Sequence, residues 1–192
     1  ADRHRLLDGW KARLTGAVTA PAPGPPPRDG EPANTVEIFL ALGDTIRRKR
    51  LSVVLFEDLL SAFAQDVSVT RYAAWDDVLD YSRRSANPVG RLVLRIAGYD
   101  EPRLDAWSDA ICSALQLTNF WQDLKIDFDR GRIYLPAEEI AGHGAAEADL
   151  AAGRLVELLH RHAIGRKRLH HGARQFLRRL HYRRQRVRVD DR

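Results

Sequence analysis

Apolar residues recur every three or four positions over long stretches of the chain, which is the spacing of amphipathic helices. The first stretch covers residues 2–18, with an apolar side made of Leu6, Leu7, Trp10, Leu14 and Val18. A second helix is predicted over 35–50, and a third should open at Ser52 and bury Phe56, Leu59, Leu60 and Phe63. No convincing alternating strand pattern precedes the last forty residues or so, and the sequence therefore predicts an all-α fold.

A proline-rich segment over 20–33 separates the first two predicted helices. Six of the nine prolines lie between 21 and 32. Proline removes a backbone donor and clashes with the preceding helical turn, so no helix should cross this segment. We expect a mobile surface loop within one domain, followed by a helix capped by Asn34 or Thr35.

Two further helices are predicted, each with a marked interruption or end. The first covers residues 75–97, and Asn87-Pro88 should kink it over 86–89. The second runs from Leu104 to about Phe128 and stops at Gly131, because glycine readily adopts the left-handed conformation that ends helices. Residues 133–136 should leave this helix as an extended segment.

The helix predicted over 104–128 carries a polar stripe beside its apolar one. The polar positions are Gln116, Asn119, Asp123 and Asp127, at offsets of three, seven and eleven, which places them on one face. Carboxylates four residues apart repel each other unless a cation lies between them, and carboxylate and amide oxygens suit Mg²⁺. Spacing alone leaves a solvated acidic face as the alternative.

Two segments of the chain resemble the squalene/phytoene synthase family. Residues 114–136 read ALQLTNFWQDLKIDFDRGRIYLP and resemble its second aspartate-rich signature, and residues 81–90 read YSRRSANPVG and resemble its kinked substrate-channel helix. The similarity covers about residues 1–140. Within the family, the chain looks most like the hopanoid-pathway branch, the hydroxysqualene synthases.

The resemblance implies an isoprenoid synthase fold, which is a helical bundle around a central apolar channel, with Mg²⁺ as cofactor. By position, the implied metal ligands are Asn119, Asp123 and Asp127. The implied catalytic residues are Asp123, Asp127, Tyr81 and Tyr134, and the implied substrate-binding residues are Gln116, Asn119, Arg132, Val89 and Gly90. The substrate would be a prenyl diphosphate, either presqualene or farnesyl diphosphate.

Three activities stay open. The branch implied by the resemblance converts presqualene diphosphate to hydroxysqualene with loss of diphosphate. A squalene or phytoene synthase would instead condense two prenyl diphosphates. From a different class, the chain could be a catalytically dead helical remnant that binds lipid or a partner.

The resemblance also sets expectations about what the chain lacks. The family's first aspartate motif belongs upstream of residue 1, so we expect a domain incomplete at both ends and little activity from residues 1–192 alone. The segment Asp76-Asp77-Val78-Leu79-Asp80 spells the DDxxD pattern of other prenyl synthases. We interpret it as an ordinary acidic helix start, because acidic side chains complement the helix dipole there.

Charge changes sharply near residue 150. The net charge of +5 divides into about −5 over 1–153 and +10 over 154–192. We therefore predict a helical domain over 1–150 and a basic Arg/His-rich segment over 151–192. That segment is either a non-native or disordered end or an arm that contacts an anionic membrane, and we expect no nucleic-acid partner.

The remaining composition points to a cytoplasmic protein, with peripheral contact at the inner membrane as an option. The chain has one cysteine, Cys112, which excludes a disulfide framework within it and predicts a buried filler. No run approaches the roughly 20 apolar residues of a membrane-spanning helix, and the first residues lack a signal-peptide core.

Overall fold

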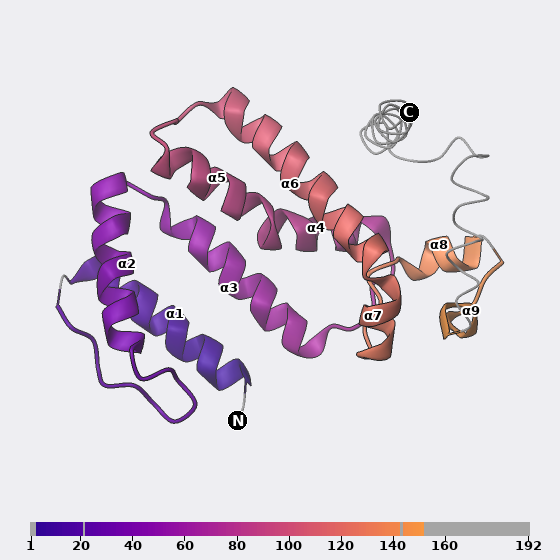
Figure 1. Ribbon diagram of the computed structural model, residues 1–192, viewed down its shortest axis with the longest axis horizontal. Coiled ribbons are helices and arrows are strands. Elements are labelled where there is room, and N and C mark those ends of the chain that lie inside the picture. The colour runs from indigo at the N-terminus through magenta and orange to yellow at the C-terminus, as the bar shows by residue number, and fades with distance from the viewer. Residues whose placement is uncertain (1–2, 21, 143, 152–192) are drawn as a thin grey trace, which may run out of the picture. The chain divides into compact units, whose positions relative to one another are not determined.

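The computed structural model describes residues 3–20, 22–142 and 144–151. All regular secondary structure in these ranges is helical, which confirms the all-α prediction (Figure 1). The helices are α1 (Arg3–Thr19), α2 (Thr35–Lys49), α3 (Val53–Ser68), α4 (Trp75–Ser85), α5 (Asn87–Ile96), α6 (Pro102–Gln122), α7 (Leu124–Asp129), α8 (Ala137–Gly142) and α9 (Glu147–Ala151). The predicted basic segment lies almost wholly outside the described residues. In the described part, no helix has the length and apolar content needed to cross a membrane.

The helices belong to two compact units. Unit 1 comprises the chain up to Thr70 together with Trp75–Ser113. Unit 2 comprises Arg71–Ala74 together with the chain from Ala114 onward. The four-residue segment Arg71–Ala74 therefore belongs to unit 2, although the rest of that unit begins about forty residues later in the sequence.

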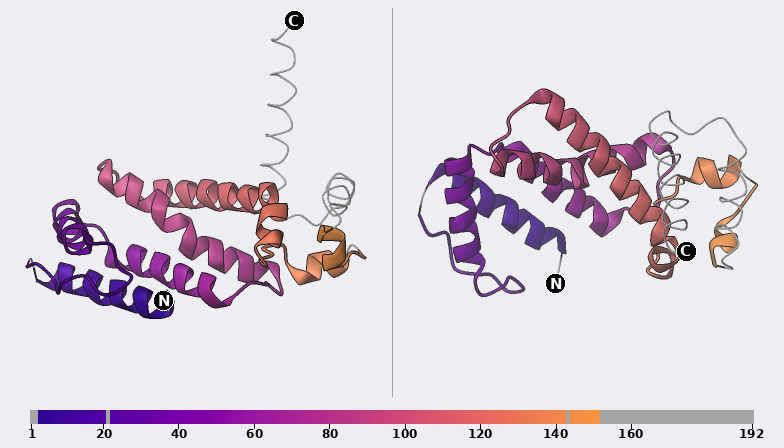
Figure 2. Two further views of the ribbon diagram at one scale, coloured as in Figure 1. Left: turned by 60° about the horizontal axis from the view of Figure 1, so that its bottom comes forward. Right: turned by 45° about the horizontal axis from the view of Figure 1, so that its top comes forward.

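The core of unit 1 forms where α1, α2 and α3 pack together (Figure 2). Leu14 of α1, Ile46 of α2 and Leu51 are buried in one cluster, and half-buried apolar side chains of α2, α3 and α5 surround them. Helices α1 and α2 approach closely at Gly43, where an added Cβ would run into the carbonyl oxygen of Ala17. Glycine at this position is what permits the close approach.

The proline-rich loop, predicted from the sequence to be a mobile surface loop, is fixed to α1 by a buried arginine. Arg13 donates to the carbonyl oxygens of Pro25 at 2.7 Å and Pro26 at 2.8 Å. It also forms a 2.6 Å ion pair with Glu31, and the two side chains are only 2% and 0% exposed. The spacing of apolar residues could not predict this ion pair, because the pair joins a helix to an irregular segment.

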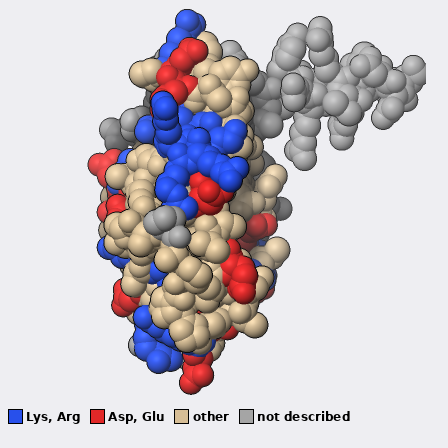
Figure 3. All heavy atoms as spheres, turned by 90° about the vertical axis from the view of Figure 1, so that its left-hand side faces the viewer, with Lys and Arg blue, Asp and Glu red and all other residues tan. Residues whose placement is uncertain are grey.

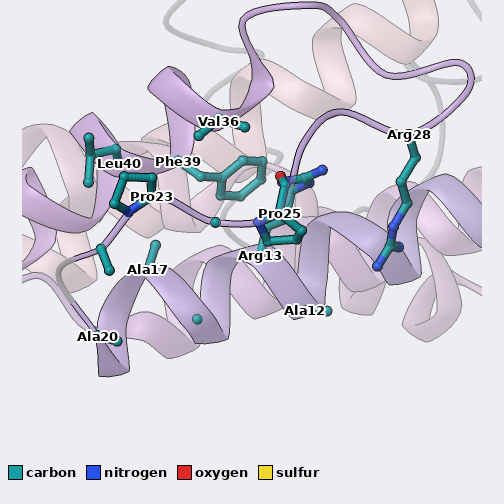
Figure 4. A pocket seen from close by; sticks show the side chains of 13 residues that line it. Ala12, Arg13, Ala17, Ala20, Pro23, Pro25, Arg28, Val36, Phe39 and Leu40 are labelled. Atoms are coloured by element: carbon teal, nitrogen blue, oxygen red, sulfur yellow. The ribbon is translucent and has the colours of Figure 1, made fainter.

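A small pocket of about 230 Å³ lies between α1, the proline-rich loop and α2 (Figure 4). Small residues of α1 form its floor, and Pro23, Pro25, Phe39 and Leu40 form much of its wall. None of its lining residues belongs to the set that the sequence predicted as functional.

Basic side chains gather on the face of unit 1 that carries α2 (Figure 3). Arg47, Arg48 and Lys49 occupy the last turn of this helix. Arg47 donates to the carbonyl oxygen of Ala17 near the end of α1, and Lys49 donates to that of Ile96 at the end of α5. These cations satisfy backbone carbonyls at helix C-termini, where the helix dipole is negative, and this explains much of the cluster.

Most predicted helix boundaries are confirmed. The predicted kink is a break at Ala86 between α4 and α5, and Pro88 lies in the first turn of α5, where its missing N–H is not needed. Gly131 has a φ of +80°, as its place after α7 predicts. Residues 133–136 are non-helical and buried.

Asn34 and Ser52 are the N-cap residues of α2 and α3, as predicted, although neither makes a side-chain cap hydrogen bond, and the hydroxyl of Thr35 donates back to the carbonyl of Pro32. Two local predictions were wrong. The helix predicted over 104–128 is interrupted at Asp123, which has φ −93° and ψ 6° and is the N-cap residue of α7. Phe63, predicted to be buried, is 44% exposed.

Candidate functional site

The polar stripe survives the helix interruption because the backbone hydrogen bonds continue through it. The amide of Asp123 donates to the carbonyl of Asn119 at 2.8 Å, and the amide of Asp127 donates to that of Asp123 at 2.8 Å. Asn119, Asp123 and Asp127 therefore lie on successive helical turns, one turn apart along the chain. Gln116 precedes them in α6. Asp is a weak helix former that favours helix starts, and this fits a break at Asp123.

The stripe leaves oxygen atoms available for a cation. Among the described residues, the carboxylate of Asp123 and the amides of Asn119 and Gln116 have no hydrogen-bond or ion-pair partner. Asp123 and Asp127 are half-buried. Two carboxylates with one amide match the hard oxygen donors that Mg²⁺ takes from proteins, which it binds through one or two carboxylates and completes with water and phosphate.

The stripe residues supply only some of the ligands that a complete metal site needs. In the ranges that the structure describes, no group of three or more His, Cys, Asp or Glu side chains could hold a metal. The stripe therefore fits Mg²⁺ as a partial set of ligands, one that needs further oxygen atoms from substrate, water or other residues.

Arg132 and Tyr134 lie together just after α7. The Arg132 guanidinium donates to the hydroxyl of Tyr134 at 2.9 Å and lies 5.9 Å from the centre of its ring. The amide of Arg132 donates to the carbonyl of Asp127 at 2.8 Å, which folds the chain back toward the stripe. The guanidinium is thus fixed close in the chain to the second carboxylate of the stripe.

Tyr134 is the middle ring of a buried aromatic stack. On one side Phe120 lies parallel to it, with centroids 3.9 Å apart and planes at 5°. On the other side Tyr72 stacks at 5.6 Å and 24°. Phe120 follows Asn119 in α6, so the stack joins the polar stripe to the segment that carries Arg132.

Sequence reasoning missed Arg71 and Tyr72. Arg71 donates to the carbonyl of Gly131 at 2.7 Å and to both carboxylate oxygens of Glu147 at 2.8 and 3.1 Å. The hydrogen bonds that Arg71 donates to Glu147 raise the pKa of Arg71. Both residues fall in a connector without helical periodicity, so no pattern marked them.

Tyr81, Val89 and Gly90 belong to unit 1. Tyr81 is buried, and its hydroxyl donates to Asp66 of α3 at 2.9 Å. Val89 is 50% exposed on α5. A Cβ at Gly90 would run into the side-chain ends of Ser108 and Cys112 on α6, so a side chain here would force those two groups to move. Cys112, predicted to be buried, is a half-buried free thiol.

The DDxxD segment starts a helix, as interpreted from the sequence. Asp76 and Asp77 lie in the first turn of α4. Asp80 lies one turn later and pairs with Arg83 and Arg84 at 2.9 and 2.8 Å. Burial alone would raise the pKa of Asp80, but the hydrogen bonds from the two arginines outweigh it and the pKa is lowered.

Comparison with known proteins shows what this chain is similar to. Residues 1–189 match squalene/phytoene synthase. The hydroxysqualene synthases of Zymomonas mobilis and Sinorhizobium fredii are 47% and 43% identical over 48% and 50% of this chain, and the matches cover 31% and 33% of those proteins. The phytoene synthase of Arthrospira platensis is 35% identical over 79% of this chain and 49% of its own.

A solved structure agrees with the fold. The squalene synthase HpnC from Alicyclobacillus acidocaldarius superposes with a TM-score of 0.72 at 35% identity, over 84% of this chain and 57% of that one. The chain thus spans about a third to a half of the curated relatives that it matches. With 189 of its 192 residues matched and an all-helical fold shared with a solved relative, the chain belongs to the squalene/phytoene synthase family.

Proposed function

We propose that the chain forms one wall of the active site of a prenyl diphosphate enzyme that converts presqualene diphosphate to hydroxysqualene. In this reaction the bond between carbon and the diphosphate oxygen breaks and the carbon skeleton rearranges. A water oxygen then bonds to carbon and the water loses a proton. The observation that carries the proposal is the stripe of carboxylate and amide oxygens along α6 and α7, followed five residues later by Arg132.

Each residue of unit 2 has a role in this proposal. Asn119, Asp123 and Asp127 would hold Mg²⁺, which supplies positive charge to the departing diphosphate. Arg132 offers a planar fork of donors to the diphosphate oxygens, and Tyr134 orients that fork through its hydroxyl. Gln116 adds a neutral polar group one turn before Asn119.

The unit 1 residues have a different role. Val89 and Gly90 belong to the helix that would line the apolar channel, where exclusion of water protects the reacting hydrocarbon from early capture. Tyr81 is proposed as a catalytic hydroxyl near this channel helix. Its bond to Asp66 fixes the direction of the hydroxyl before substrate arrives.

The hydroxysqualene branch is favoured because the two hydroxysqualene synthases are 43% and 47% identical over about half of this chain, against 35% over 79% for the phytoene synthase. The condensation of two prenyl diphosphates is the second candidate. It is supported by the longer share of the chain, 79%, over which the Arthrospira relative aligns.

Product analysis separates the two candidates. The test uses what we call the extended chain, which is residues 1–192 joined in cis to the upstream segment of the Zymomonas mobilis relative. With Mg²⁺ and presqualene diphosphate, the extended chain should release hydroxysqualene. Formation of squalene or phytoene-type hydrocarbon from two prenyl diphosphates would support the second candidate, and no lipid product from either substrate would contradict both.

A further inference from the structure

We propose that Arg71 and Tyr72 are positioning residues for the diphosphate side of the site, because they fix the turn and the ring that together place Arg132. This inference rests on the proposed function. Neither residue is part of the stripe, and both precede it by more than forty positions in the sequence.

The first observation that supports the proposal is the hydrogen bond from Arg71 to the turn after α7. Gly131 takes a positive φ of +80°, and its carbonyl accepts the 2.7 Å hydrogen bond from Arg71. The Nε and Nη2 atoms of the same guanidinium donate to the Glu147 carboxylate, which fixes the direction of the guanidinium. Since Arg132 follows Gly131 directly, the orientation of this peptide determines where the Arg132 side chain begins.

The second observation is the packing of two aromatic rings against Tyr134. Its ring is enclosed between Tyr72 and Phe120, and all three side chains are buried. Its hydroxyl accepts from Arg132, so a shift of the ring would move the far end of the Arg132 side chain. Tyr72 therefore helps to position the guanidinium of Arg132 through Tyr134, and Arg71 helps to position the backbone of Arg132 through Gly131.

The third support is backbone pairing at the end of the extended segment. The amide of Ala137 donates to the carbonyl of Tyr72 at 2.9 Å, and the amide of Glu138 donates to the carbonyl of Ala73 at 3.1 Å. The segment 71–74 thus contacts the 131–138 region at its start, its middle and its end. Misplacing a binding group by about 1 Å can lower a rate about 100-fold, so such support matters for catalysis.

A double-mutant cycle in the extended chain tests the proposal. Arg132→Ala should lower kcat/KM at least tenfold, and Arg71→Ala should lower it about 10- to 100-fold although Arg132 is present. The double variant should resemble Arg132→Ala alone, because Arg71 acts through Arg132. Purely structural damage would instead multiply the two single effects.

Conservative variants keep the test decisive if Arg71→Ala does not fold. Arg71→Lys retains the charge but cannot hold Gly131 and Glu147 together, so it should replace Arg71→Ala in the cycle with a similar result. Tyr72→Ala should also lower kcat/KM, and Tyr72→Phe should restore it because the stacked ring remains. Arg48→Ala, which removes an exposed arginine of α2, serves as the matched control.

Two results would overturn this inference while leaving the proposed function intact. These are full activity in Arg71→Ala and Tyr72→Ala while Arg132→Ala is impaired, or effects that multiply in the double variant. If Arg132→Ala and Asp123→Ala are both fully active, the proposed function itself fails, so the two failures are distinguishable.

Discussion

Glu31→Gln should destabilise unit 1 far more than an ordinary surface substitution. The change keeps the shape of the side chain and an oxygen acceptor, but it removes the charge that faces Arg13. The two side chains are 2% and 0% exposed, so the guanidinium would remain buried without a counter-charge. Breaking a buried ion pair costs about 3–5 kcal/mol. We expect the low end, about 3 kcal/mol, because Arg13 keeps its bonds to Pro25 and Pro26.

Urea unfolding followed by far-ultraviolet circular dichroism measures this loss. With a slope of about 1.5 kcal/mol per molar urea, the midpoint should fall by roughly 2 M. Asp44→Asn is the matched control, because the Arg48–Asp44 pair has side chains 77% and 48% exposed and exposed pairs contribute at most about 1 kcal/mol. Replacing both Arg13 and Glu31 by Met should cost less than Glu31→Gln, since no charge is left unpaired.

The same pair gives a pH dependence of known sign. The hydrogen bond from Arg13 is the main cause that lowers the pKa of Glu31 below its ordinary 4.5. The carboxylate therefore adds stability above about pH 4.5, and that stability is lost as the pH falls through the lowered pKa of the folded protein. The difference in unfolding free energy between the parent and Glu31→Gln should be constant from pH 7 to 5 and shrink below 4.5.

Two results would refute this reasoning. A loss no larger than that of Asp44→Asn at pH 7 would mean that the pair is not effectively buried. A difference that stays constant well below pH 4 would mean that the Glu31 charge is not its cause. Hydrogen exchange over residues 22–33 locates the effect, because the Arg28 amide donates to Glu31 at 2.8 Å and should exchange faster in Glu31→Gln.

Two further predictions concern backbone positions. Gly43→Ala should cost about 2–3 kcal/mol, because the added methyl meets the carbonyl of Ala17, and Gly90→Ala should cost about 1 kcal/mol, because side-chain ends can move. Gly16→Ala, with nothing within 4 Å, should add about 0.5–1 kcal/mol, and a different order of the three urea midpoints would contradict the packing described. Arg50 follows α2 with φ 52°, and Arg50→Gly should add about 0.5–1 kcal/mol while Arg50→Ala adds nothing. An equal gain from Arg50→Ala would show that the strain is not the cause.

Local periodicity was enough to predict α1 to α6 and most of their ends, but it did not predict the short helices α8 and α9. The break at Ala86 and the left-handed Gly131 follow from the chemistry of proline and glycine, which acts within a few residues. Periodicity could not detect the interruption at Asp123, since the hydrogen bonds from Asn119 to Asp127 keep the i, i+4 spacing on both sides of it.

The parts that could not be predicted are contacts across long sequence separations. Arg71 meets Gly131 and Glu147 across 60 and 76 residues, and Arg13 meets Glu31 from a loop without repeating pattern. No periodic property marks either arginine. The composition of the polar stripe was evident from the sequence, whereas the contacts that hold Arg132 in place come from the connector 71–74, which only folding brings close to it.

Release of diphosphate by the extended chain as a function of Mg²⁺ tests the central claim most directly. With presqualene diphosphate, Asp123→Ala and Asp127→Ala should each lower the rate about 100- to 1,000-fold while retaining the helical spectrum. Asp77→Asn and Asp80→Asn should leave the Mg²⁺ dependence unchanged, and residues 1–192 alone should be nearly inactive. Release that survives the loss of either stripe aspartate, or that fails on loss of Asp77 or Asp80, would contradict the assignment of the site to α6 and α7.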